Sequence, residues 1–279
     1  MTRDVLEVIN TRRYPLDGSN PDALAQIIAA ARVSLAEVGY AELPGFIAGP
    51  SLDALVADAE SLAPRAHRSS GPGTAYLELP DEERFEEHHP RRRWMPYEVG
   101  AVAYDLMPLD SPLRRIYETE VLRAFLEAVL GRGELHRYAD PFGALNLAVM
   151  GEGDELQWHF DQTDFVVSLA IQSSDQGGEF EVVPHLRTQD DEHYDRVAAV
   201  LDGTADAIVT LPMTPGTLLI FEGRNSLHRV TPIEGQRLRY VGLLAYDTGA
   251  ETESSQLLRL VRYGRTEPFE IPPTEWVAS

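Results

Sequence analysis

The segment Trp158-His159-Phe160-Asp161 carries side chains that could bind a metal ion together. Residues two apart on a β-strand point to the same face, so the imidazole of His159 and the carboxylate of Asp161 can reach one ion. His228 could supply a second imidazole from a later, neighbouring strand. Two histidines and one carboxylate on one face suit a divalent first-row metal and leave three coordination positions open. Those positions would accommodate a bidentate co-substrate and dioxygen.

Two arginines follow the second histidine. Arg237 comes nine residues after His228, just past the turn Glu234-Gly235-Gln236, and Arg239 shares its strand parity. A guanidinium group binds a carboxylate through two parallel hydrogen bonds. Either arginine could therefore anchor the far end of a dicarboxylate such as 2-oxoglutarate. The alternative is that both lie on the surface and balance an acidic protein.

Three polar residues close to the expected metal site are candidates for contacts with a substrate: Asn146, Gln157 and Gln162. The alternative is that they are polar only because half-exposed strands carry such residues in any case. Trp158 should face away from the metal because side chains alternate along a strand, and we expect it to pack in the core.

Cap residues, prolines and glycines mark three helices in the first part of the chain. We expect these helices to run from Asn20-Pro21 to Gly39, from Ser51 to before Pro64, and from Ser111-Pro112 to Gly131. A polar stretch with Gly71-Pro72-Gly73 and the run 81–93 lies between the second and third helices. It is expected to be a loop-rich connection that could cover a site.

From about Gly143 the chain reads as short strands separated by turns such as Pro215-Gly216. This pattern indicates a sandwich or barrel. We predict a mainly β fold with α: a double-stranded β-helix (jelly-roll, cupin-like) core with an N-terminal helical annex. Within one domain, residues 1–135 would form the mostly helical annex, 136–265 the core and 266–279 a C-terminal tail. The expected strands are 144–150, 157–160, 165–172, 179–183, 207–211, 217–221, 227–230 and 238–246, with a helical insertion at 190–201.

The charge and composition of the chain indicate which kinds of molecule it could bind. A net charge of −21 over 279 residues argues against nucleic-acid binding, because a phosphate backbone would be repelled. The chain has no cysteine, which excludes disulfides and thiolate metal sites. The segment Met1–Glu7 lacks the apolar run of a signal peptide, and no segment has the apolar length of a membrane span. We expect a soluble, cytoplasmic protein that acts on a small molecule.

The run from His159 to Asp247 resembles the core of Fe(II)/2-oxoglutarate oxygenases, including Gly177-Gly178-Glu179-Phe180 and Pro215-Gly216-Thr217-Leu218. More narrowly, the chain is similar to the free-amino-acid (lysine) radical halogenases and their hydroxylase relatives. That similarity rests on the segments 159–161, 178–181, 223–230 and 244–248, and more loosely on 139–143. The resemblance implies that His159, Asp161 and His228 bind Fe(II), that Arg237 or Arg239 binds 2-oxoglutarate, and that dioxygen is consumed.

One departure from the halogenases bears on the reaction. In those enzymes a small residue stands where this chain has Asp161, which leaves a coordination position for chloride. The carboxylate here favours hydroxylation of an unactivated C–H bond, with release of succinate and carbon dioxide. Leu156 and Gln162 stand where the lysine pocket has other polar residues, so the substrate is expected to be a free amino acid or a similar small polar metabolite rather than lysine in particular.

Three alternatives remain from the sequence. The same iron core could catalyse ring closure or desaturation. A cupin-type dioxygenase would need no 2-oxoglutarate, although the predicted arginine argues against it. A jelly roll without catalytic activity could serve as a binding module.

Overall fold

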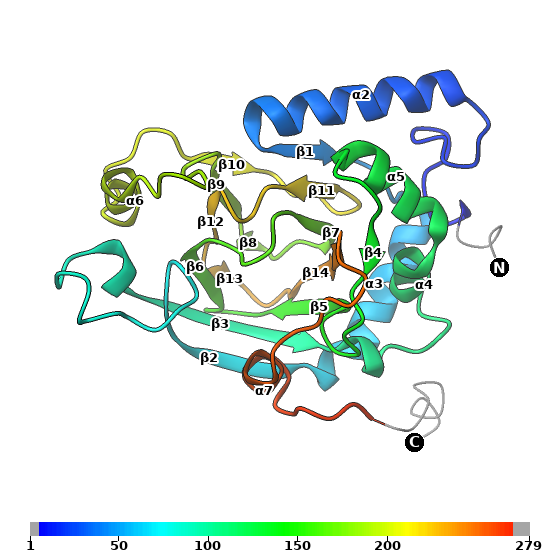
Figure 1. Cartoon of the computed structure of the whole chain (residues 1–279). Coiled ribbons are helices and arrows are strands. Elements are labelled where there is room, and N and C mark those ends of the chain that lie inside the picture. Colours follow the sequence, from blue (N-terminus) through cyan, green and yellow to red (C-terminus); the bar gives the residue numbers. More distant parts are fainter. Residues whose placement is uncertain (1–5, 270–279) are drawn as a thin grey trace.

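The centre of the structure, a computed structural model that describes residues 6–269, is an antiparallel sheet of eleven strands (Figure 1). Its strands are β1 (Tyr40–Leu43), β2 (His67–Thr74), β3 (Trp94–Val102), β5 (Leu145–Met150), β6 (Glu155–His159), β7 (Val166–Gln172), β9 (Phe180–Val183), β10 (Val209–Leu211), β11 (Leu218–Phe221), β12 (Leu227–Val230) and β14 (Arg239–Leu244). They run in the order β1-β11-β7-β14-β5-β3-β6-β12-β9-β10, and β2 pairs with β3 beside this path. The sheet curls into a half-barrel, and the predicted jelly-roll core is confirmed.

Helices and short elements surround this sheet. The α-helices are α2 (Pro21–Val38), α3 (Pro50–Leu62), α4 (Pro112–Glu118), α5 (Glu120–Leu130), α6 (Tyr194–Leu201) and α7 (Gln256–Tyr263). Three 3-10 turns are η1 (Ala63–Arg65), η2 (Pro90–Arg92) and η3 (Tyr104–Leu106). Two small ladders pair β13 (Ile233–Glu234) with β8 (Gln176–Gly177) and β15 (Tyr246–Asp247) with β4 (His136–Arg137). Within the described residues, no helix combines the length and hydropathy needed to cross a membrane.

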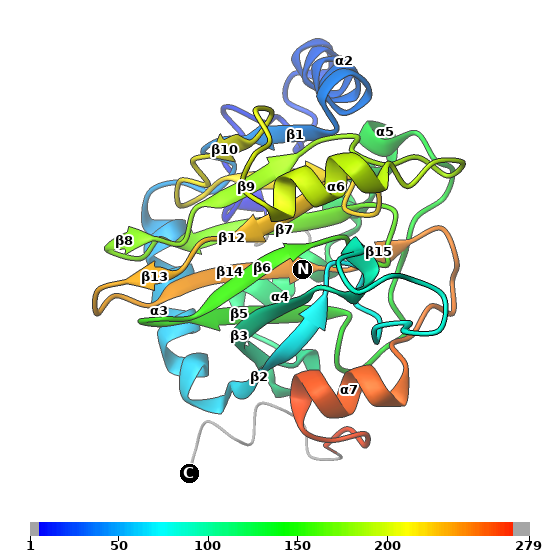
Figure 2. The same ribbon diagram turned by 90° about the vertical axis from the view of Figure 1, so that its left-hand side faces the viewer.

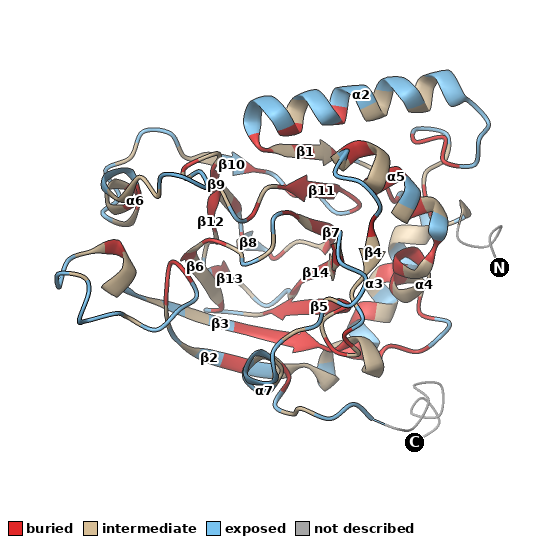
Figure 3. Ribbon diagram, in the orientation of Figure 1, coloured by how far each residue is buried: buried red, intermediate tan, exposed pale blue. Residues whose placement is uncertain are grey.

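The two faces of the sheet bury different clusters. Along β14, Tyr240 and Leu244 pack in the large cluster that also contains the buried side chains of α3, α4 and α5. Val241, on the other face of β14, belongs to the cluster inside the curl. This alternation follows from the two-residue period of a strand. Figure 3 shows the central strands buried and the outward side of α2 exposed. The inside of the curl therefore holds side chains from β5, β7, β9, β11, β12 and β14.

Local capping explains where the N-terminal helices begin and end. Asn20 accepts a hydrogen bond from the backbone N–H of Ala23, Pro21 occupies the first turn, and Gly39 ends α2 with a φ of 73°. The single helix expected from Ser111 to Gly131 is instead two helices, α4 and α5. Thr119 is extended, with a ψ of 132°, and its side chain caps the start of α5. A good cap inside an apolar helical pattern therefore divided the helix.

The expectation that residues 1–135 are mostly helical is wrong in part, because β1, β2 and β3 come from this region and belong to the large sheet. β2 and β3 pair over eight residues, from His67↔Ala101 to Thr74↔Trp94. The prolines and glycines that indicated a loop are tolerated because β2 pairs only with β3 and so lies at an edge of the sheet. Residues 1–5 lie outside the described residues. So do residues 270–279, which make up most of the predicted C-terminal tail.

The connection between β2 and β3 lies against the segment that carries α6. Arg91 donates to the hydroxyl of Tyr194 at 2.9 Å and pairs with Glu192 at 2.9 Å. Next to β6, the backbone N–H of Phe160 donates to the carbonyl of Ala75 at 2.8 Å. The connection and α6 therefore form one cover at the end of the half-barrel where β6 ends (Figure 2).

Candidate metal centre

Three side chains converge where β6 ends beside β12. His159 is the last residue of β6 and pairs directly with His228 on β12, while Asp161 follows two residues later. One ligand atom from each of the three lies within 4.8 Å of the other two. The Nε2 atom of His228 is 3.2 Å from the Asp161 carboxylate, and that of His159 is 3.9 Å from it. Two ligands at about 2.1 Å from one ion and at right angles are roughly 3 Å apart, so the three groups can share one ion.

Backbone carbonyls fix the orientation of both imidazoles. The Nδ1 atom of His159 lies 2.8 Å from the carbonyl of Gln157, and that of His228 lies 2.9 Å from the carbonyl of Ser226. A carbonyl can only accept, so each Nδ1 carries the proton and each Nε2 presents a lone pair to the centre. The ring of His228 is also packed against Phe221, with centroids 4.9 Å apart. These contacts set the tautomer that a metal ligand requires.

The short distance between His228 and Asp161 is unfavourable unless a proton or a metal ion lies between the two groups. With Nδ1 of His228 donating to a carbonyl, its Nε2 is an acceptor that faces the carboxylate, another acceptor, at 3.2 Å. The Oδ2 atom of Asp161 is buried and has no hydrogen-bond partner among the described residues. Either a proton on His228 or a metal ion between the groups relieves this arrangement. Burial opposes charge on His228, but the adjacent carboxylate outweighs it and raises the pKa of His228.

The pKa values of His159 and Asp161 are both lowered, which favours the protonation states that bind a metal. Burial, helped by the nearby imidazole of His228, lowers the pKa of His159 to about 4. Burial alone would raise the pKa of Asp161, but the two imidazoles outweigh it and the pKa is lowered. A neutral imidazole and an ionised carboxylate are the ligand forms that bind divalent metals.

Asp161 is held from behind by the segment that precedes β12. Its backbone N–H donates to the carbonyl of Gly223 at 3.1 Å. A Cβ atom at Gly223 would lie 2.2 Å from the carboxylate oxygen of Asp161, so only glycine leaves room for this carboxylate. Arg224 adds a second link, because its guanidinium donates to Asp164 and to the carbonyl of Gln162. Arg132 extends it by contacting both Asp164 and Glu222.

No role was predicted from the sequence for Gly223, Arg224 or Arg132, although the segment 223–230 carried part of the family resemblance. Gly223 and Arg224 stand in the segment that leads to His228, so their position in the chain was visible. Their contact with Asp161 and the residues after it is a tertiary contact, and a glycine that makes room for a distant side chain leaves no periodic signal.

The two candidate arginines occupy different environments. Arg237 precedes β14, its side chain is 55% exposed, and it lies 3.7 Å from Asp175. Arg239 is the first residue of β14 and is buried inside the curl, where it donates only to the sulfur of Met150 at 3.8 Å. Among the described residues, no carboxylate lies within 4 Å of its guanidinium, and burial lowers the pKa of Arg239 to about 10. A buried cation without a partner costs several kcal/mol, so this site calls for an anion.

A glycine also makes room for Arg239. A Cβ atom at Gly178 would lie 2.9 Å from the Cδ atom of Arg239. Gly178 itself has a φ of 68°, a conformation that suits glycine. The sequence motif that contains Gly178 thus has a packing role beside the buried arginine.

The three polar candidates lie in different places. Asn146 is 7% exposed and shares a face of β5 with Ala148 and Met150, so it points inside the curl, and its Oδ1 atom has no partner among the described residues. The side chain of Gln157 bonds to Glu155, and its carbonyl orients His159. Gln162 is exposed. Only Asn146 therefore presents an unpaired polar atom to the interior.

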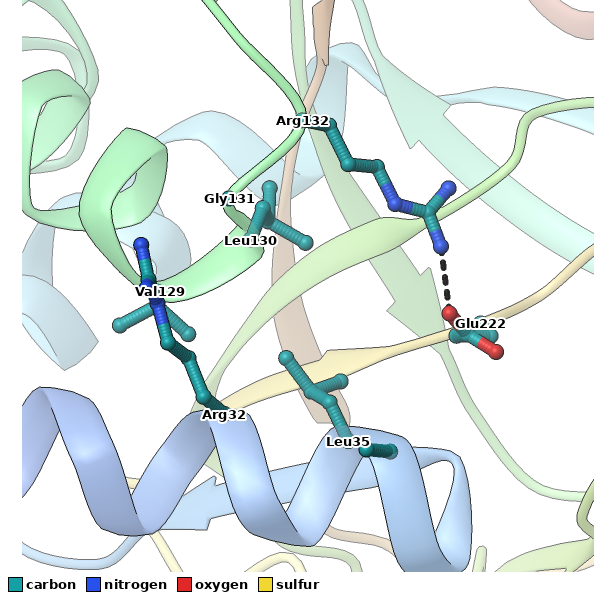
Figure 4. A pocket seen from close by; sticks show the side chains of 8 residues that line it. Arg32, Leu35, Val129, Leu130, Gly131, Arg132 and Glu222 are labelled. Atoms are coloured by element: carbon teal, nitrogen blue, oxygen red, sulfur yellow. Dashed lines mark hydrogen bonds and ion pairs between the residues drawn. The ribbon is translucent and has the colours of Figure 1, made fainter.

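One cavity of the molecule is separate from this centre. It has a volume of about 310 Å³ and lies between α2 and α5 (Figure 4). Leu35, Val129 and Leu130 form its apolar wall, and Arg132 reaches across to Glu222. Because Glu222 directly precedes Gly223, the cavity lies behind the segment that supports Asp161, and the metal ligands do not line it.

Comparisons with known proteins identify a family from the sequence and similar folds among solved structures. A family model described as halogenase D matches residues 96–258, more than half of the chain. Among solved structures, AviO1 from Streptomyces viridochromogenes Tue57 is 21% identical, with a TM-score of 0.53 over 80% of this chain and 96% of that one. The non-haem α-ketoglutarate-dependent carbocyclase SnoK of nogalamycin biosynthesis is 17% identical, with a TM-score of 0.55 over 88% and 94%. The epimerase SnoN of the same biosynthesis is 14% identical, with a TM-score of 0.56 over 80% and 81%.

At these identities the likeness is one of fold. No curated protein sequence matches the chain significantly.

Proposed function

Because the chain belongs to the halogenase D family, we propose that it is an Fe(II)- and 2-oxoglutarate-dependent oxygenase that hydroxylates its substrate instead of halogenating it. One observation carries this proposal: the carboxylate of Asp161 lies 3.2 Å from Nε2 of His228, within the group of three side chains that could hold a metal ion. A halide would need the coordination position that this carboxylate would occupy on a bound metal ion. Bound iron, with 2-oxoglutarate and dioxygen, supplies an oxidant that breaks an unactivated C–H bond, with release of succinate and carbon dioxide.

The ligand set fits iron. His159 and His228 offer neutral imidazole nitrogens, and Asp161 offers an ionised carboxylate whose Oδ2 atom is otherwise unpartnered. Two histidines and one carboxylate on one side of an ion are the donor set of non-haem Fe(II) oxygenases and leave the opposite positions free. The role of the protein is to hold these three groups in place, which the carbonyls of Gln157 and Ser226 and the contact with Gly223 accomplish.

Arg239 supports 2-oxoglutarate as the co-substrate. It is a buried cation inside the half-barrel with no acidic partner among the described residues, so an anion bound there would offset its desolvation. We propose that its guanidinium binds the far carboxylate of 2-oxoglutarate and that Arg237, which is exposed, does not. A cupin-type dioxygenase that uses no 2-oxoglutarate would have no anion to pair with the buried guanidinium of Arg239.

The substrate is proposed to be a free amino acid or a similar small polar metabolite. The support is the resemblance to amino-acid halogenases and their hydroxylase relatives, together with the unpaired Oδ1 atom of Asn146 inside the curl. Ring closure and desaturation use the same metal centre, and the carbocyclase SnoK shares the fold, so the identity of the product separates these outcomes.

An anaerobic titration tests the assignment. Addition of Fe(II) and 2-oxoglutarate to the protein should produce the charge-transfer absorption of an iron-bound 2-oxo acid. His159→Ala and His228→Ala should each abolish it, while Gly71→Ala, far along β2, should not. A protein that forms no such absorption, or that binds iron equally well in both histidine variants, is not an oxygenase of this class. In the latter case, a jelly-roll binding module would be the better explanation.

The halide question has its own test. Wild-type protein supplied with excess chloride should give only hydroxylated product by mass spectrometry. Asp161→Gly should lose hydroxylation, because the carboxylate that completes the ligand set is gone. Chlorinated product from the wild type would contradict the proposal while leaving the iron and 2-oxoglutarate assignment intact.

A further inference from the structure

Phe160 separates His159 from Asp161 in the chain, and its ring packs against the guanidinium of Arg187. The ring is 1% exposed and belongs to the buried cluster that contains Tyr76 and the inward side chains of α6. The guanidinium carbon of Arg187 lies 4.1 Å from the centre of the ring. An arginine over an aromatic face is attracted by the ring, and the attraction is stronger where water is excluded. The position of this ring therefore depends on Arg187.

Arg187 also binds the segment that supports Asp161. Its Nε atom donates to the carbonyl of Arg224 at 2.6 Å, and its backbone N–H donates to the carbonyl of Asn225 at 3.2 Å. Arg224 directly follows Gly223, whose carbonyl accepts from the backbone N–H of Asp161. One arginine thus contacts both the segment that carries Asp161 and the segment that lies behind it.

An ion pair fixes the direction of this guanidinium. An Nη atom of Arg187 lies 3.1 Å from the carboxylate of Glu192, and the same carboxylate pairs with Arg91 at 2.9 Å. Arg91 belongs to the connection between β2 and β3, which is part of the cover described above. The side chains of Arg187 and Arg91 are 14% and 20% exposed, so water and salt screen these pairs less than pairs on the surface. Glu192 therefore holds Arg187 in one orientation and joins it to the cover.

The three contacts of the side chain together require a planar group. One face of the guanidinium stacks on Phe160, while two of its nitrogens donate to the carbonyl of Arg224 and to the carboxylate of Glu192. A lysine ammonium is a compact point charge with no plane to stack. Lysine would balance the charge of Glu192 equally well, so the arrangement has a geometric role in addition to charge balance.

We propose that Arg187 positions the metal ligands: it clamps Phe160 to the segment before β12 and so fixes Asp161 relative to His159 and His228. This inference rests on the proposed oxygenase function and deepens it. Arg187 is a positioning residue, because it acts through Phe160 and the Arg224 carbonyl and is not itself a ligand of iron or of 2-oxoglutarate.

The experiment measures Fe(II) affinity by anaerobic titration and records the charge-transfer absorption with 2-oxoglutarate. Arg187→Met should lower Fe(II) affinity about 10- to 100-fold, the loss found when groups that orient metal ligands are changed, and should shift the absorption maximum. Arg187→Lys should lose nearly as much affinity, because the planar group is gone. Arg196→Met removes an exposed arginine of α6 and should change neither measurement. Unchanged affinity in Arg187→Met, or full affinity in Arg187→Lys, would overturn the proposal.

A second comparison distinguishes positioning from stability. Ile116→Val removes one buried carbon from α4, in the other large cluster, and so lowers stability without altering the contacts of Arg187. Chemical denaturation measures the stability of each variant. Ile116→Val should bind Fe(II) as tightly as wild type does. If it loses as much affinity as Arg187→Met, the loss follows stability alone and Arg187 has no positioning role.

A double variant tests whether Glu192 acts through Arg187. Glu192→Gln should weaken Fe(II) binding less than Arg187→Met does, because the contacts with Phe160 and Arg224 remain. The double variant should bind iron no more weakly than Arg187→Met alone. Additive losses would contradict the proposed contact path.

The wild type separates this inference from the function on which it rests. If wild type forms the charge-transfer absorption and Arg187→Met is indistinguishable from it, the role of Arg187 is refuted and the oxygenase assignment stands. If wild type forms no such absorption, the proposed function itself fails.

Discussion

At the scale of single residues, the proposed metal centre depends on the residues that surround His159, Asp161 and His228 as much as on these three. Gly223 has no Cβ at the point where the carboxylate of Asp161 lies, and Gly178 has none where Arg239 passes. Both glycines therefore make room for a side chain of the proposed sites. The same reasoning distinguishes Arg239 from Arg237, since only the buried arginine lacks an acidic neighbour within 4 Å.

Gly223→Ala should displace Asp161 and weaken iron binding. The new Cβ would lie 2.2 Å from the carboxylate oxygen, while the φ of Gly223 is outside the left-handed region, so the backbone itself accepts alanine. We expect Fe(II) affinity to fall by about 10- to 100-fold, the range found when groups that support metal ligands are changed. Anaerobic titration measures it, and circular dichroism checks the fold. Gly71→Ala is the matched control, because a Cβ there would lie at an ordinary 3.6 Å. Unchanged iron affinity in Gly223→Ala would mean that Asp161 does not bind the metal.

Arg239→Met should make the protein more stable and at the same time abolish the binding of 2-oxoglutarate. A buried unpaired cation is replaced by an apolar chain, so we expect the protein without ligands to gain about 1–4 kcal/mol in free energy of unfolding. The folded pKa of about 10 lies below the ordinary value of 12.5, so the penalty is fully present at neutral pH and is relieved as pH rises above about 10.

The same variant should lose 2-oxoglutarate binding and keep iron binding, as measured by thermal unfolding and by the charge-transfer titration. Arg237→Met is the control and should keep both ligands. If Arg237→Met loses 2-oxoglutarate and Arg239→Met does not, the assignment of the two arginines is reversed.

At the scale of elements, one link joins the segment after β6 to the segment before β12. Arg224 contacts Asp164 and the carbonyl of Gln162, and Arg132 contacts Asp164 and Glu222. These ion pairs are half-exposed, and such pairs contribute only about 0–1 kcal/mol to stability. Their effect should instead appear in the position of Asp161, which lies between the two linked segments.

Arg224→Ala tests this link. We expect iron affinity to fall about 10-fold because Asp161 is held less firmly, while the free energy of unfolding changes by less than about 1 kcal/mol. Anaerobic iron titration and chemical denaturation give the two values. Arg237→Ala removes an exposed arginine away from the link and should change neither. A large loss of stability with unchanged iron affinity would show that Arg224 supports the fold and not the ligand.

At the scale of the whole molecule, the structure without ligands contains two unfavourable arrangements that ligands would relieve. Two acceptors face each other at 3.2 Å in the proposed metal centre, and Arg239 is a buried cation with no acidic partner among residues 6–269. Both lie on the curled sheet, so binding at either place stabilises the same cooperative unit.

Fe(II) and 2-oxoglutarate should therefore each raise the melting temperature of the protein. A ligand present at about 100 times its Kd adds about 2.7 kcal/mol, which for a protein of this size corresponds to roughly 5–10 °C. We expect Fe(II) alone under anaerobic conditions to raise Tm, 2-oxoglutarate alone to raise it less, and a chelator to reverse the shift from iron. Differential scanning fluorimetry measures these shifts. In His159→Ala the shift from iron should disappear. An equal shift in that variant would place the bound metal elsewhere.

Local chemistry in the sequence determined much of this molecule. The spacing of His159 and Asp161, with a histidine on a later strand, indicated the candidate metal centre, although β6 ends at His159 and Asp161 lies just beyond the strand. Capping signals at Asn20 and Gly39 predicted α2 from its first turn to its end. The alternation and turns after Gly143 predicted the strands of the half-barrel. Each of these features depends on residues a few positions apart.

Tertiary structure decided what local patterns leave open. Arg237 and Arg239 have the same strand parity, and only the start of β14 at Arg239 buries one and exposes the other. β2 pairs with β3 despite Pro72, because an edge strand can forgo a hydrogen-bond donor that an inner strand needs. Pro96 of β3 lies before the residues of that strand that pair with β5 and β6. The contact between Gly223 and Asp161 brings together segments far apart in the chain. Such contacts depend on the curvature of the sheet. That curvature results from all the strands together and is not encoded in any single segment.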